Sequence, residues 1–162
     1  MHDSLKPCMT AACAVLASGM LSAETLVWTG AASSDWNLTD LNWTNATGEA
    51  TAWVNGSDAL FPSNAVPPVS VTGDVELHNL TLARRADEFL WSDGGGSLTF
   101  VSSGANPTNY IRFGNDTKHH DLRARVSCAG PFVKEGNAVL YLFNANNNFA
   151  AGIFQAMSQM RI

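Results

Sequence analysis

Alternation of apolar and polar residues is the main signal in this chain, and it begins after Glu24. Side chains that alternate with period two lie on opposite faces of an extended strand, so each such run predicts a strand with one buried face. Residues that favour turns, chiefly Gly, Asn, Asp and Ser, separate the runs. The chain is therefore predicted to be all-β, with strands at 69–72, 75–78, 80–82, 98–101, 110–113, 122–126 and 139–143.

The predicted strands follow one another at nearly regular intervals. Four of their centres, Leu98, Ile111, Val126 and Leu140, are separated by 13, 15 and 14 residues. Such spacing is typical of a β-sandwich, a barrel and a coiled solenoid, and it does not distinguish them. Segment 83–90 lacks the alternation and is rich in charge, so we expect an exposed connection there.

Tryptophan residues are concentrated in segment 24–68, which ends at the Pro67-Pro68 pair. Large amphipathic rings either close the end of a hydrophobic core or form an exposed platform on which sugar rings stack. Two interpretations are therefore open. The segment is a Trp-rich N-terminal cap, or it carries a carbohydrate-binding site at Trp36, Trp43 and Trp53.

The N-terminus has the features of a secretory signal peptide at residues 1–23. A polar start with one cation, Lys6, precedes an apolar run at 9–21, and Leu21-Ser22-Ala23 supplies small residues for cleavage. The apolar run is too short to span a bilayer. We expect a secreted or cell-surface protein, and a periplasmic location is the alternative. The mature chain is not expected to insert into the membrane.

Charge and cysteine content narrow the function classes. The formal net charge is −5, which argues against nucleic acid as a partner. Cys8 and Cys13 lie in the predicted signal peptide, so Cys128 alone remains and cannot form an internal disulfide. Since no histidine motif accompanies Cys128, we expect a small buried side chain rather than a nucleophile.

Candidate catalytic groups are sparse. His119 and His120 lie just past a predicted turn at 114–118, where a solvated loop is expected. On a strand their side chains would point to opposite faces, and only in a loop could they share a metal ion. The acidic residues are dispersed, without the local pair that sugar hydrolysis needs. The sequence predicts no catalytic residue, no metal site, no cofactor and no enzyme.

A resemblance to a known family rests on several segments. Residues 130–142 (Gly-Pro-Phe-Val-Lys-Glu-Gly-Asn-Ala-Val-Leu-Tyr-Leu) resemble the repeat of bacterial proteins with autotransporter-associated β-strand repeats, and 144–152 stand in the place of that repeat's last turn. Segments 25–30, 35–37 and 52–61 are similar to the openings of such proteins.

The resemblance implies a right-handed parallel β-helix, or β-solenoid, with the Trp-rich segment as its cap and its strands within 69–155. A β-sandwich remains the alternative fold. One repeat near 130–152 and an irregular tail at 156–162 make the chain an expected N-terminal fragment of a longer passenger protein. Because one solenoid turn cannot bury its apolar face alone, an open last turn is expected to self-associate.

The function expected from this resemblance is a non-catalytic structural or adhesion module at the cell surface or outer membrane. Its expected partners are extracellular glycans or surface proteins. The alternatives are a carbohydrate-binding module and a fragment of a β-helix enzyme that degrades polysaccharides.

Overall fold

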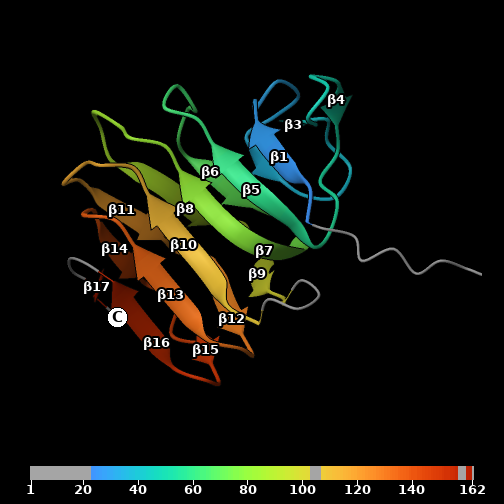
Figure 1. Cartoon of the computed structure of the whole chain (residues 1–162). Helices are drawn as coiled ribbons and strands as arrows, with labels where there is room; N and C mark the ends of the chain where they lie inside the picture. The colour runs from blue at the N-terminus through green and yellow to red at the C-terminus, as the bar shows by residue number, and fades with distance from the viewer. Residues whose placement is uncertain (1–22, 103–106, 157–159, 162) are drawn as a thin grey trace, which may run out of the picture.

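The computed structural model describes residues 23–102, 107–156 and 160–161 of the chain. Within these ranges the regular structure consists of strands alone, which confirms the all-β prediction (Figure 1). The predicted signal peptide lies outside the described residues, apart from Ala23. The strands are β1 (Thr25–Trp28), β2 (Asp35–Trp36), β3 (Trp43–Thr44), β4 (Ala50–Thr51), β5 (Ser57–Phe61), β6 (Val69–Val71), β7 (Asp74–Leu82), β8 (Phe89–Asp93), β9 (Ser97–Phe100), β10 (Asn109–Phe113), β11 (His119–Leu122), β12 (Arg125–Cys128), β13 (Phe132–Glu135), β14 (Val139–Leu142), β15 (Asn148–Phe149), β16 (Ile153–Ala156) and β17 (Met160–Arg161).

The strands form two sheets, and the chain passes repeatedly from one to the other. The first sheet has the order β15-β12-β9-β7-β5-β1-β3-β4, with β10 paired to β7 and β13, and β16 paired to β13. The second sheet has the order β17-β14-β11-β8-β6-β2. Among the described residues, every pairing is parallel except those of β3 with β1 and with β4.

Parallel partners are 20 to 35 residues apart in the chain. The shortest separation joins His119 to Val139, and the longest joins Asp35 to Ser70. A strand therefore pairs mostly with the strand that follows one circuit later rather than with its immediate neighbour in sequence. Parallel strands need such long connections, because a tight hairpin can join only antiparallel ones.

The core lies between the two sheets and is built of inward-facing residues in register from strand to strand. One such row comprises Val69, Trp91, Leu122 and Leu142, all at most 3% exposed. Burial of a large apolar side chain stabilises a fold by about 1.5–3 kcal/mol. Residues that share a row thus stabilise neighbouring circuits together, which is how the alternating pattern becomes a continuous core.

Strand β7 is long enough to pair with two later strands, one along each half of its length. Its residues Asp74–Leu77 pair with β9, whereas Asn79–Leu82 pair with β10. The register of β5 against β7 shifts between Ser57 and Ala59, so an irregularity falls at the centre of β7. The alternation predicts two strands, 75–78 and 80–82; the structure joins them through this irregularity.

Two other predictions are corrected. The strand predicted at 122–126 is the corner between β11 and β12, where Leu122, Ala124 and Val126 are all fully buried. The tail predicted to be irregular, 156–162, contains the end of β16 and the short β17.

The two ends of the strand array differ (Figure 1). Strands β1, β3 and β4 lie at one end, where the chain folds back antiparallel over β1. Strands β15, β16 and β17 lie at the other end, and within the described part of the chain each pairs with a single strand. The first end is therefore built by an antiparallel excursion of the chain, while the strands at the other end are each paired on one side among the described residues.

Candidate functional site

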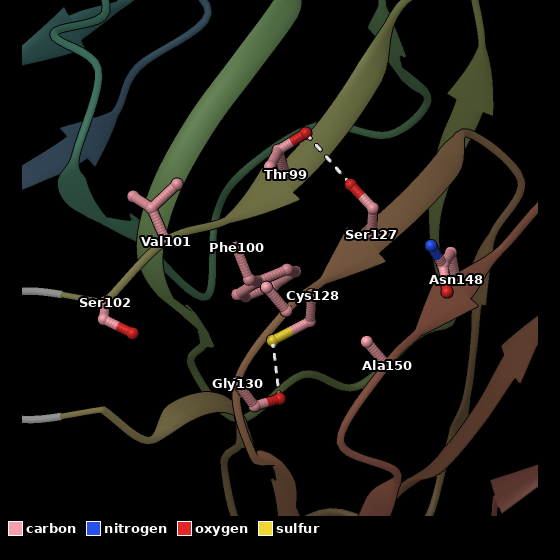
Figure 2. Close-up of a pocket in the computed structure, with 10 residues that line it drawn as sticks. Thr99, Phe100, Val101, Ser102, Ser127, Cys128, Gly130, Asn148 and Ala150 are labelled. Carbon is pink, nitrogen blue, oxygen red and sulfur yellow. Dashed lines mark hydrogen bonds between the residues drawn. The ribbon is translucent and has the colours of Figure 1, made fainter.

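A pocket of about 420 Å³ opens beside β9, β12 and β15 (Figure 2). Thr99 and Ser127 lie on neighbouring strands with their hydroxyl oxygens 3.1 Å apart, and Asn148 continues the row because it pairs with Ser127. The pocket thus offers a short row of uncharged hydrogen-bonding groups beside a mainly apolar wall. Its remaining lining is Phe100, Val101, Ser102, Cys128, Ala129, Gly130 and Ala150.

The thiol of Cys128 borders this pocket but is not poised for chemistry. Cys128 is 2% exposed, and its S–H group faces the side-chain oxygen of Asn109 and the carbonyl of Gly130, each at 3.3 Å. Burial raises the pKa of the thiol, so it stays protonated at neutral pH and is a poor nucleophile. The predicted small buried side chain is confirmed.

A row of buried amides runs along the corner near Cys128. The Asn79 amide donates to Asp58 at 2.9 Å and accepts the backbone N–H of Tyr110 at 2.9 Å. On the next circuit, the fully buried Asn109 donates to the carbonyls of His78 and Val101, both at 2.8 Å. These side chains satisfy backbone groups where the strands turn, which gives them a structural role.

Asp116 and His120 hold the connection between β7 and β8 in place. Asp116 Oδ2 accepts the backbone N–H of Arg85 at 3.2 Å, and His120 Nδ1 accepts that of Phe89 at 3.1 Å. Because Nδ1 is an acceptor, the neutral ring carries its proton on Nε2, which donates to Asp116 Oδ1 at 3.3 Å. One buried pair, which we call the Asp116–His120 clamp, therefore fixes both ends of segment 85–89.

The Asp116–His120 clamp is buried, and another charged side chain is buried close to it. Burial lowers the pKa of His120, and the negative charge of Asp116 opposes this shift without cancelling it. Lys134 on β13 is also fully buried, and burial lowers its pKa against the opposing charge of Asp116. Its Nζ donates to the carbonyl of Gly136 at 2.8 Å and lies 5.3 Å from the ring centre of Phe113. Since His120 is 0% exposed, no substrate reaches its ring in this structure.

Two hollows on the outer face of the second sheet meet at Arg123. One, of about 340 Å³, is lined by residues that include Glu88, Leu90 and Asp121; the other, of about 490 Å³, is lined by residues that include Asp93 and Phe143. Arg123 lines both, so the two hollows adjoin at this residue, near β8, β11 and the end of β14. We call the two hollows together the Arg123 groove.

The tryptophans predicted to form a sugar platform lie in the core instead. Trp36, Trp43 and Trp53 are 0, 0 and 4% exposed, and their ring centres are 4.7–5.1 Å apart. Trp28 and Phe61 pack against the same cluster. Stacking needs an open ring face, which none of the three predicted residues offers. Their burial matches the other interpretation, in which the rings close one end of the core.

The solvated loop predicted around His119 and His120 is wrong for His120. Both residues lie on β11, where His119 is exposed and His120 is buried. Adjacent residues of a strand point to opposite faces, so the two imidazoles cannot share a metal ion. Within the described ranges, no group of three His, Cys, Asp or Glu side chains is placed to hold one.

Sequence reasoning missed the clamp and Lys134. Asp116 and His120 are four residues apart, but their partners Arg85 and Phe89 come from the preceding circuit, so no local motif marks them. A signal for Lys134 does exist: it occupies an inward position of the alternation, two residues after the buried Phe132. A lysine at such a position predicts a buried, partnered ammonium group.

Comparisons with known proteins leave the family resemblance as a prediction. In the part of the chain that the structure describes, no helix has the length and apolar character to cross a membrane. No protein-family model, curated protein or solved structure matches this chain.

Proposed function

We propose that this chain is a non-catalytic structural or adhesion module of the secreted or cell-surface kind, built as a right-handed parallel β-helix. The observation that carries the proposal is the parallel pairing of strands one circuit apart in two sheets that the chain visits in turn. A β-sandwich is built mainly from antiparallel strands, so this pairing favours a stack of turns over a sandwich.

The distribution of residues supports a scaffold. Inward positions are occupied by apolar residues in register, while outward positions of the same strands carry varied polar and charged groups. In a stack of turns, each turn contacts only its neighbours, so the outer surface can vary without altering the core. The Trp cluster at the β1 end fits the role of a cap that closes the first turn.

The outer faces of the sheets and the strands at the C-terminal end suggest which partners the chain would bind. Extracellular glycans or surface proteins would meet the outer faces of the sheets. The edge strands β15, β16 and β17 would pair with another copy of the chain, because each of them pairs with one strand among the described residues and Phe154 is 56% exposed. Export would follow from residues 1–23 acting as a signal peptide.

Cell fractionation tests the export. The full chain, carrying a C-terminal epitope tag, is produced in Gram-negative cells, and the mass of the tagged product is measured in each fraction. We expect a product that begins at Glu24, outside the cytosol. An uncleaved chain in the cytosol would refute export.

Adhesion is tested with the purified mature protein on beads. We expect the beads to bind at least one immobilised extracellular glycan or matrix protein, and beads carrying the Leu140→Asp variant to lose this binding. Leu140 is 0% exposed, so a carboxylate there disrupts the core. Equal binding by both bead types would show that adhesion does not depend on the fold, and failure to bind any of a broad panel would refute an adhesion role.

A further inference from the structure

In the Arg123 groove, aromatic and hydrogen-bonding side chains gather on the outer face of the second sheet. Strand pairing sets Leu90, Asp121 and Tyr141 side by side on β8, β11 and β14. One step further along these strands, Phe143 follows β14 and its backbone N–H donates to the carbonyl of Leu122 at 3.1 Å, which brings it next to Arg123. The side chains of the groove are thus held in place by the sheet beneath them.

Phe143 is a large apolar residue whose side chain is exposed to solvent. It is 56% exposed even though Tyr141 stacks against it, with ring centres 5.6 Å apart and 12° between the ring planes. The guanidinium of Arg123 lies 5.3 Å from the Phe143 ring centre. The exposed part of the ring is therefore steadied by two neighbours, which lowers the entropy cost of a ligand packing on it.

The charges of the groove select among ligands. Three carboxylates, those of Glu88, Asp93 and Asp121, line it together with one guanidinium. Arg123 already donates to Asp121 at 3.1 Å, so its charge is partly neutralised. A surface with an excess of carboxylates repels acidic polysaccharides and nucleic acids.

We propose that the Arg123 groove binds a neutral oligosaccharide. Carboxylate oxygens accept hydrogen bonds from neighbouring sugar hydroxyls, and the Arg123 guanidinium donates to sugar oxygens. The Asn144 amide uses one N–H for the carbonyl of Arg123 at 3.2 Å and donates the other to the sugar. The 56% exposed Phe143 side chain offers apolar surface against which the C–H groups of a sugar pack. This inference deepens the proposed adhesion role, on which it rests, by assigning the contact surface and the ligand class.

The experiment uses the mature protein and an array of neutral hexose and N-acetylhexosamine oligomers, with acidic oligosaccharides and cationic peptides printed beside them. The strongest neutral ligand is then titrated by calorimetry against the wild type and three variants. Phe143→Ala and Arg123→Ala each remove one side of the groove. Leu41→Ala is the matched control, because Leu41 is 52% exposed but lies between β2 and β3 and lines neither hollow.

We expect the array to show neutral oligosaccharide binding, and Phe143→Ala to weaken it about tenfold, as loss of one aromatic contact does. Arg123→Ala should weaken it as well, and Leu41→Ala should leave it unchanged. Circular dichroism confirms that each variant is folded, and truncation of these exposed side chains is not expected to unfold the chain.

Several outcomes overturn the inference. They are absence of binding to any neutral oligosaccharide, stronger binding to the acidic oligosaccharides or the peptides, and equal loss of binding in the Phe143 and Leu41 variants. If the beads still adhere to a matrix protein, the adhesion role stands and the groove assignment alone fails. If both assays are negative, the proposed function fails with it.

Discussion

Acidification should loosen the connection between β7 and β8, because the Asp116–His120 clamp works only while His120 is neutral. Nδ1 accepts the backbone N–H of Phe89, and a proton on Nδ1 would place two donors against each other. The charged groups that act on this ring are Asp116 and Glu88, which favour its protonation, and Arg85, which opposes it. Burial outweighs them and lowers the pKa of His120 below its ordinary value of 6.5.

The sign and size of the effect follow from proton binding. Below pH 6.5 the unfolded chain protonates this histidine, whereas the folded chain does not until the pH reaches its lowered pKa. The stabilisation is therefore complete above pH 6.5 and is lost as the pH falls below that value. One proton changes the free energy of unfolding by at most about 1.4 kcal/mol per pH unit.

The assay is urea unfolding of the mature chain at several pH values between 7.5 and 5, with hydrogen exchange at the Arg85 and Phe89 amides. His120→Asn keeps an acceptor near the position of Nδ1 but cannot titrate, so its free energy of unfolding should depend less on pH. His119→Asn, on the exposed neighbour, should behave as the wild type. A wild-type stability that is flat over this range, or an equally steep dependence in His120→Asn, would refute the reasoning.

Three further predictions concern the core and the turns. Trp43→Ala should lower the free energy of unfolding by about 3–5 kcal/mol in urea titrations, because the ring is fully buried, whereas Leu41→Ala, at a 52% exposed site, should change it by less than about 1 kcal/mol; a mild effect at Trp43 would contradict its place in the core. Gly136→Ala should cost clearly more than Gly48→Ala in thermal melts, since both glycines have positive φ but only at Gly136 would the new Cβ lie 2.3 Å from a carbonyl oxygen; equal costs would show that the close contact relaxes. Asn109→Ala should cost about 2 kcal/mol or more in urea titrations, because two buried carbonyls lose their donor; a neutral result would mean that water replaces the amide.

Alternation predicted several strands, but it missed β5, β8 and β13, and the exposed connection predicted at 83–90 contains the buried start of β8. It also could not locate a corner between sheets. Leu122, Ala124 and Val126 continue the period-two pattern without a break, yet the chain turns between Leu122 and Val126. All three side chains point into the same core from two sides of the corner. A pattern of burial carries no information on which sheet a residue belongs to, so the prediction merged two strands into one.

The candidate site was harder to predict, because its residues meet only after the chain has completed a circuit. Trp36, Trp43 and Trp53 were correctly identified as a group, but period and composition could not tell a buried ring cluster from an exposed one. The Arg123 groove combines residues of β8 and β11 with residues of the segments that follow β11 and β14. These residues are far apart in the chain, so no local motif marks the groove.

The separation of 20 to 35 residues between parallel partners has a consequence for the route by which the chain folds. Closing a loop costs entropy that grows only slowly with loop length, by about 0.6 kcal/mol for each doubling. Every parallel pairing spans a loop of similar length, so no single distant encounter dominates the barrier. We expect ordering to spread from one circuit to the next, and the connection that closes slowest to set the overall rate.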